Sequence, residues 1–338
     1  MLGHTQRLLG RLGLAQYAAE VFLDDTFFQK WFDMQYLRAK LFLAGLLTTL
    51  TTIAVGLPAA DLKPEALQER IANKPKTPGQ IVLHQRTRTE SSKGSGEWNE
   101  AGKEVVWNAS ETAIIVCDMW DGHYCVSATE RVADMVPRMN AVLMAARNLG
   151  ATIIHAPSGV TYHYADMPQR KRMQQATKFK PDLPLEAWCH VDPKREPELP
   201  VDVSKQACDD VVVGAVVQKF SRQHPGLTIS GWDGVSDNGE EILSFLKQEG
   251  LKNVVLMGVH TNMCVLGRPF GIRQMVKQGF NVVLARDLTD AMYDPREKPY
   301  VSHTRGTELI VEHIEKYWCP SISSEDLTRV ARGSADPK

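Results

Sequence analysis

Short apolar runs alternate with longer helical segments between residues 109 and 320. Runs of a few β-branched residues bounded by polar ones are typical of buried parallel strands. Five such runs occur in this region: Ala113–Val116, Thr152–Ile154, Val211–Val213 extending toward Val217, Val254–Met257 and Val282–Leu284. The alternation predicts one α/β domain with a doubly wound, mainly parallel sheet and helices on both faces.

Helical spacing of apolar residues precedes Gly150 and Gly250, and glycine commonly ends a helix. In a doubly wound sheet, ligands bind beyond the carboxyl ends of the strands. The residues that directly follow the predicted strands are therefore candidates for a functional site. Three of them carry chemistry: Asp118, Lys219 and Cys264.

The chain of 338 residues is long enough for one large domain with extensions. For residues 61–108 the sequence predicts a linker followed by a hairpin. Two short apolar runs, 81–83 and 105–107, flank a segment rich in Gly and Ser, as the two strands of a hairpin flank their turn. The domain is expected over 109–320, and residues 321–338 are expected to form a C-terminal tail.

Residues 41–57 form the only long uncharged apolar run, and they follow the basic residues Arg38 and Lys40. This pattern is typical of a signal peptide or a membrane anchor over 1–60, with 1–33 as an over-called start. Export to the periplasm or the exterior is the favoured interpretation. An uncleaved anchor and an amphipathic core helix are the alternatives.

The charge balance, 39 Lys and Arg against 40 Asp and Glu, carries no electrostatic signature of nucleic acid or an anionic membrane. We expect a small-molecule substrate as partner, a homo-oligomer, and membrane contact only through the N-terminal segment. The six cysteines are scattered without a CxxC pair, which indicates neither a zinc ribbon nor a dense disulfide framework.

Three segments together resemble the isochorismatase-like (nicotinamidase-like) hydrolase family. They are TAIIVCDMWD (112–121), VVQKFS (216–221) and NVVLMGVHTNMCV (253–265), and they occur in the family's order. The segment QGFNVVLARDLTDA (278–291) is similar to the next strand of that family. The resemblance covers about residues 112–318 and implies the isochorismatase-like hydrolase fold.

The resemblance implies a cysteine hydrolase whose catalytic residues are Asp118, Lys219 and Cys264. It also implies that the backbone N–H groups of His260 and Cys264 hold the oxyanion, with a cis peptide bond between Val259 and His260. The expected reaction is hydrolysis of a C–N bond in a small amide or carbamoyl-type compound, through a thioester on the cysteine.

These residue types suit that chemistry. A thiol with a pKa of ~8.5 becomes a useful nucleophile when a cation or a helix N-terminus lowers its pKa. Lys219 and the helix expected near Asn262 are candidates for that role, and Asp118 can act as base and then as acid. Taken singly, Asp118 could be a helix cap, Cys264 a buried apolar residue and Lys219 a solvated charge. Their joint occurrence in family order favours catalysis.

The sequence departs from nicotinamidases where those proteins supply metal ligands. The segment here reads IIHAPSGVTYHYAD (153–166). The four residues that could gather around a cation match no standard ligand spacing: Asp121, His123, His155 and His163. No metal or other cofactor is therefore predicted, and a divalent metal is the unsupported alternative.

Residues on either side of the presumed site could line a substrate pocket. Trp120, His123 and Tyr124 form either an aromatic wall or ordinary packing. Pro269 should interrupt the helix after Cys264, so that Arg268 lies either in the site as an anion clamp or on the surface.

The length of segment 166–210 exceeds that of an ordinary connection and predicts a lid or an oligomer arm.

Two other functions are alternatives to the amide hydrolase. An isochorismatase-type ether hydrolase lacks a cysteine at the nucleophile position, so Cys264 argues against it. A non-catalytic binding protein on the same fold is disfavoured by the presence of all three catalytic residue types.

Overall fold

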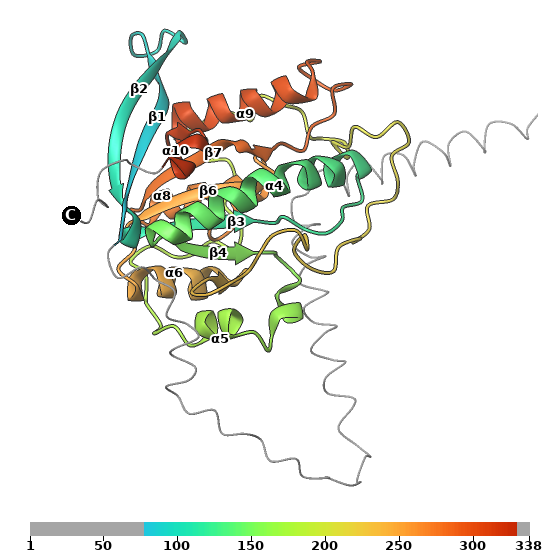
Figure 1. Ribbon diagram of the computed structural model, residues 1–338. Helices are drawn as coiled ribbons and strands as arrows, with labels where there is room; N and C mark the ends of the chain where they lie inside the picture. The colour runs from blue at the N-terminus through green and yellow to red at the C-terminus, as the bar shows by residue number, and fades with distance from the viewer. Residues whose placement is uncertain (1–77, 330–338) are drawn as a thin grey trace, which may run out of the picture. The chain divides into compact units, whose positions relative to one another are not determined.

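The structure, a computed structural model, describes residues 78–329 (Figure 1). The predicted signal or anchor region 1–60 and most of the linker lie outside the described residues. Within the described part, no helix is long and apolar enough to cross a membrane.

An eight-stranded sheet runs through the described region in the order β2-β1-β8-β7-β6-β3-β4-β5. Neighbouring strands from β8 to β5 are parallel, and only the β1–β2 hairpin is antiparallel to its neighbours. The strands are β1 (Gln80–Glu90), β2 (Trp98–Asn108), β3 (Thr112–Cys117), β4 (Thr152–Ala156), β5 (Gly234–Val235), β6 (Asn253–Val259), β7 (Asn281–Asp290) and β8 (Ser321–Ile322). The predicted mainly parallel sheet is confirmed.

Helices cover both faces of this sheet (Figure 1). Ile114 and Val116 of β3 pack in one apolar core with α4 and α10, whereas Ala113 and Ile115 pack in a second core with α6, α8 and α9. The helices are α4 (Val126–Leu149), α5 (Pro168–Gln174), α6 (Gly239–Gln248), α7 (Cys264–Gly267), α8 (Ile272–Lys277), α9 (His303–Tyr317) and α10 (Glu325–Thr328), with 3-10 turns at Ala109–Glu111 and Thr161–Tyr164. Alternate burial of this kind makes the sheet doubly wound.

The predicted hairpin is present and longer than its apolar runs. Ile81 and Leu83 are fully buried in the core, while Arg86 and Arg88 both pair with the buried carboxylate of Glu315 on α9. The fold also continues past residue 320, where a tail was expected. Ser321–Ile322 joins the sheet as β8, and Leu327 of α10 is buried.

The predicted strand Val211–Val213 does not form, and this expectation is wrong. Val211 and Val212 are 95% and 83% exposed. The position beside β4 at the sheet edge is occupied instead by Gly234–Val235, so the valine run has no strand to pair with there.

The chain order reverses between β3 and β6. The connections lead from β3 to β4 and β5 on one side and from β6 to β7 and β8 on the other. At the carboxyl ends of this pair, Gly258 (φ 108°) packs so closely against β3 that a Cβ would lie 2.0 Å from the carbonyl oxygen of Cys117. Only glycine fits this approach, which places the residues following β3 and β6 side by side.

Candidate active site

Asp118 is the first residue after β3 and lies at the switch point of the sheet. Its φ of 47° is in the left-handed region, which Asp tolerates better than most residues. The side chain is fully buried, and Oδ1 accepts a hydrogen bond of 2.8 Å from the backbone N–H of Ser158 beyond β4. This unusual backbone conformation turns the carboxylate across the ends of the central strands.

Cys264 begins α7, and the turn before it is fixed by the end of β7. The N–H of Thr261 donates to the carbonyl of Asp290 at 2.9 Å, and the side-chain amide of Asn262 exchanges two hydrogen bonds with the backbone of Met292. The cis peptide bond expected between Val259 and His260 is present. The nucleophile candidate therefore stands on a rigid turn.

The thiol of Cys264 lies beside the carboxylate of Asp118 and the backbone N–H of His260, and both groups influence its pKa. Cys264 is 7% exposed. Burial, followed by the negative charge of Asp118, raises the pKa of this thiol to about 12, although the positive charge of Arg268 acts in the opposite direction. The expected lowering of the pKa is therefore wrong, because desolvation outweighs the cation and the four-residue α7.

Arg268 provides the cation of this cluster. Its Nε donates to Oδ2 of Asp118 at 3.1 Å, and its guanidinium lies 5.5 Å from the ring centre of Trp188. Burial alone would lower the pKa of Arg268, but the Asp118 carboxylate raises it above its ordinary value. Pro269 ends α7 after one turn, as predicted, and Arg268 points into the site and not outward.

Lys219 lies near this cluster but is not joined to it. Its carbonyl oxygen would lie 2.7 Å from a Cβ on Gly122, so the backbone is close to the loop after β3. The side chain is exposed, and the ion pairs of residues 78–329 include none between Lys219 and Asp118. The structure brings Asp118, Cys264 and Arg268 together and leaves the Lys219 amine at the surface.

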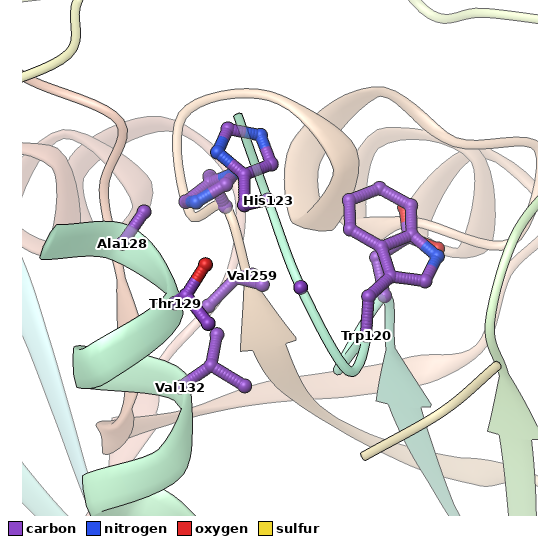
Figure 2. A pocket seen from close by; sticks show the side chains of 9 residues that line it. Trp120, His123, Ala128, Thr129, Val132 and Val259 are labelled. Carbon is purple, nitrogen blue, oxygen red and sulfur yellow. The ribbon is translucent and has the colours of Figure 1, made fainter. Parts of the chain in front are cut away.

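The loop after β3 forms one wall of a small cavity, shown in Figure 2. Trp120 and His123 face this space from the loop, and Ala128, Thr129 and Val132 face it from α4. The enclosed space is about the size of a single water molecule. Asp118 and His260 complete the lining, so the cavity adjoins the carboxylate that contacts the nucleophile.

Aromatic rings pack against this cavity. Trp120 stacks on Phe220 with ring centres 4.2 Å apart, and His123 lies 5.1 Å from His260. Burial lowers the pKa of His260 to about 4, and burial together with His260 lowers the pKa of His123 to about 3. Both imidazoles are therefore neutral at pH 7. Tyr124 is not among the residues that line the cavity, but its ring packs on His123 with ring centres 4.3 Å apart, and its hydroxyl donates to the carbonyl of Gln206 at 2.7 Å.

The four polar residues considered as metal ligands have other partners or are dispersed. His155 is buried and bonds Gln223 and Asp233, and Asp121 accepts from Ser221. His163 is exposed on the turn after β4. In residues 78–329 the only group with three ligand atoms close together is Cys125, Cys208 and Asp210.

Two features of the site were not found from the sequence. The backbone N–H of Ser158 orients Asp118, and no residue pattern marks a backbone donor. Trp188, whose indole packs on Gly267, brings the segment 183–200 over α7. The sequence signal for the position of Arg268 is Pro269. A proline that ends the helix directly after the nucleophile changes the direction of the preceding arginine.

A family model described as Isochorismatase domain matches residues 112–303. A search of curated proteins finds no match to this chain.

Several solved structures are similar to the chain at low identity. One is a cysteine hydrolase from Pseudomonas syringae pv. phaseolicola, with 16% identity, a TM-score of 0.42, and coverage of 66% of this chain and 92% of that one. Another is N-carbamoylsarcosine amidase from Thermoplasma acidophilum, with 14% identity, a TM-score of 0.35, and coverage of 66% and 99%. A third is a nicotinamidase and pyrazinamidase from Acinetobacter baumanii, with 15% identity, a TM-score of 0.34, and coverage of 64% and 98%.

Hydrolases of this family generally act without a cofactor, in keeping with the expectation from the sequence. The family model spans more than half of the chain and includes both Asp118 and Cys264. The chain belongs to the isochorismatase family and is a hydrolase.

Proposed function

We propose that the protein hydrolyses a C–N bond in a small amide or carbamoyl-type compound, through a thioester on Cys264. The observation that carries this proposal is the placement of the Cys264 thiol beside the buried Asp118 carboxylate, at the adjoining carboxyl ends of β3 and β6. A thiol with a raised pKa needs a base in direct contact at the moment of attack, and Asp118 is that base. The sulfur attacks the carbonyl carbon as its proton moves to Asp118.

The resulting oxyanion needs donors close to the sulfur. The N–H of His260 already points at the sulfur, and the N–H of Cys264 at the start of α7 makes no bond to a backbone carbonyl among residues 78–329. These two donors are suited to hold the developing negative charge. Asp118 then gives its proton to the leaving nitrogen, and the C–N bond breaks to leave the thioester.

Hydrolysis of the thioester reverses the proton movements. Asp118 accepts a proton from the attacking water, the oxyanion forms again, and the sulfur leaves with a proton from Asp118. Arg268 places a positive charge against this buried carboxylate, with Nε 3.1 Å from Oδ2. In this proposal Arg268 supplies the positive charge that the sequence suggested for Lys219.

The cavity beside Asp118 is lined by the rings of Trp120 and His123. The test is release of ammonia or amine from a panel of primary amides and N-carbamoyl compounds, with Cys264→Ala as the matched control. Turnover by the wild type and none by the variant is expected. Cleavage of a vinyl ether in place of every amide would instead support the ether hydrolase, and binding without turnover of either class would support a non-catalytic protein.

A further inference from the structure

Two buried cysteines face each other at the start of α4, outside the proposed catalytic cluster. Cys125 is the residue before α4 and is fully buried, and Cys208 is 1% exposed. Their sulfur atoms lie within 4.8 Å of each other. Neither thiol takes part in the reaction described above.

The backbone on both sides of this pair is held in place. Asp210 accepts hydrogen bonds of 2.8 and 2.9 Å from the N–H groups of Val126 and Ser127, so the carboxylate caps α4. Arg296 donates to the carbonyls of Cys208 and Asp210, both at 3.0 Å. The two cysteines are therefore presented to each other by fixed segments that lie far apart in the sequence.

The neighbouring carboxylates are already engaged. Asp210 receives a third hydrogen bond, of 2.7 Å, from the hydroxyl of Ser127. Asp209 is held by both terminal nitrogens of Arg131, at 2.8 and 3.1 Å. A metal ion at this place would compete with these bonds and lie close to a guanidinium. The Cys125 thiol donates to Oδ1 of Asp209 and of Asp210, but both of these hydrogen bonds are long, at 3.6 Å, and leave the sulfur able to react with that of Cys208.

We propose that Cys125 and Cys208 form a disulfide bond that ties the segment 200–223 to the start of α4. The reaction needs a disulfide oxidant such as oxidised glutathione. One cysteine thiolate attacks that disulfide and releases one reduced glutathione, and the second thiolate then displaces the other. The two cysteine protons end on the two glutathione thiols, so two cysteines are oxidised and one glutathione disulfide is reduced to two molecules of glutathione.

We expect this disulfide bond to form during folding or when the chain opens locally around the two cysteines, and not by attack of an oxidant on the closed fold. Burial raises the pKa of both thiols, so few thiolates are present while the pair is enclosed. The bond would restrain the wall of the cavity, because Cys125 follows His123 by two residues and the tied segment carries Phe220, which stacks on Trp120. It is distinct from the catalytic thiol and does not depend on the proposed reaction.

The test is a non-reducing peptide map of the full chain after refolding in oxidised glutathione, with thermal unfolding measured before and after reduction. A linked peptide pair containing Cys125 and Cys208 is expected. The Tm of the linked form should exceed that of the reduced form by roughly 5–15 °C. The wild-type comparison needs no variant to fold.

Cys125→Ala and Cys208→Ala should each lose both the linked peptide and the Tm difference, whereas Cys319→Ala, at another buried cysteine, should keep both. Recovery of Cys125 and Cys208 as alkylated free thiols after oxidation would overturn the proposal. One equivalent of zinc that protects both thiols from alkylation would also overturn it, in favour of a metal site.

Discussion

Arg268 donates from Nε to Oδ2 of Asp118 at 3.1 Å, and their side chains are 13% and 0% exposed beside the Cys264 thiol. Replacing Arg268 by Met would leave the buried Asp118 carboxylate without its cation and without the hydrogen bond that orients it beside the thiol. We expect kcat/KM to fall by roughly 100-fold or more. The measurement is steady-state hydrolysis of the amide identified by the substrate panel.

Lys219→Met is the matched control for this prediction, since the Lys219 amine is exposed and makes no ion pair with Asp118 among the described residues. Its kcat/KM should stay within about 3-fold of the wild type. Arg268→Met also breaks a buried pair, at a cost of about 3–5 kcal/mol, so rates are compared where thermal unfolding shows the variant to be folded. A larger fall in kcat/KM in Lys219→Met than in Arg268→Met would show that Lys219, and not Arg268, supplies the positive charge of the site.

Asp118→Asn should retain the fold but lose turnover. Asn tolerates the left-handed conformation at this position and can still accept from the N–H of Ser158. It cannot take the thiol proton or protonate the leaving nitrogen, so kcat should fall by about 10²–10⁴-fold. Asp134→Asn, on the exposed side of α4, serves as the control and should keep its rate. Undiminished turnover by Asp118→Asn would exclude Asp118 as the base.

Glu196 should be a main anchor of the segment that lies over α7. Its buried carboxylate contacts Arg273 at 2.7 Å and His313 at 2.7 Å. Burial alone would raise the pKa of Glu196, but these two hydrogen bonds lower it to about 2. Glu196→Ala leaves the buried guanidinium of Arg273 and the buried imidazole of His313 without their partner, so the free energy of unfolding should fall by about 3–5 kcal/mol.

Glu186→Ala is the control from the same segment. Glu186 is 43% exposed and pairs with Lys277 on α8, so its loss should change the free energy of unfolding by no more than ~1 kcal/mol. Urea unfolding of both variants at pH 7 measures the difference. Equal effects of the two substitutions would show that the buried network does not hold the segment.

His260 should make the fold sensitive to acid. Its pKa in the folded protein is about 4, below the ordinary 6.5, because burial disfavours the charged ring. The unfolded chain therefore takes up this proton first as the pH falls, and stability decreases between pH 6.5 and 4, by about 3 kcal/mol in total for this group. Urea unfolding at several pH values should show this decrease in the free energy of unfolding in the wild type and not in His260→Asn. Parallel pH profiles of the two proteins would contradict it.

The sequence alone predicted the elements whose patterns are local. The strands β3, β4, β6 and β7 are short apolar runs, and α4 ends at Gly150 in the left-handed conformation that the glycine suggested. The proximity of Asp118 and Cys264 could also be predicted. Both residues follow neighbouring parallel strands, β3 and β6, at the point where the strand order of the sheet reverses. The prediction of the cis peptide bond at Val259 came from family resemblance.

Features that depend on competition between distant segments could not be predicted. Val211–Val213 has strand-forming residues, but Gly234–Val235 occupies the edge beside β4, and no local pattern shows which segment pairs there. The raised pKa of Cys264 depends on how completely the chain buries it, which the sequence does not reveal. The position of Arg268 follows from Pro269, but the choice between site and surface required the packing of Trp188.

The central claim is that Cys264 forms a covalent intermediate, and mass spectrometry of the rapidly quenched protein during turnover tests it most directly. We expect the peptide that contains Cys264 to gain the mass of the substrate's acyl group, and we expect Cys264→Ala to show neither this adduct nor turnover. If the wild type hydrolyses the amide without an adduct and Cys264→Ser retains full activity, the account is contradicted, and direct attack by water under the control of Asp118 replaces it.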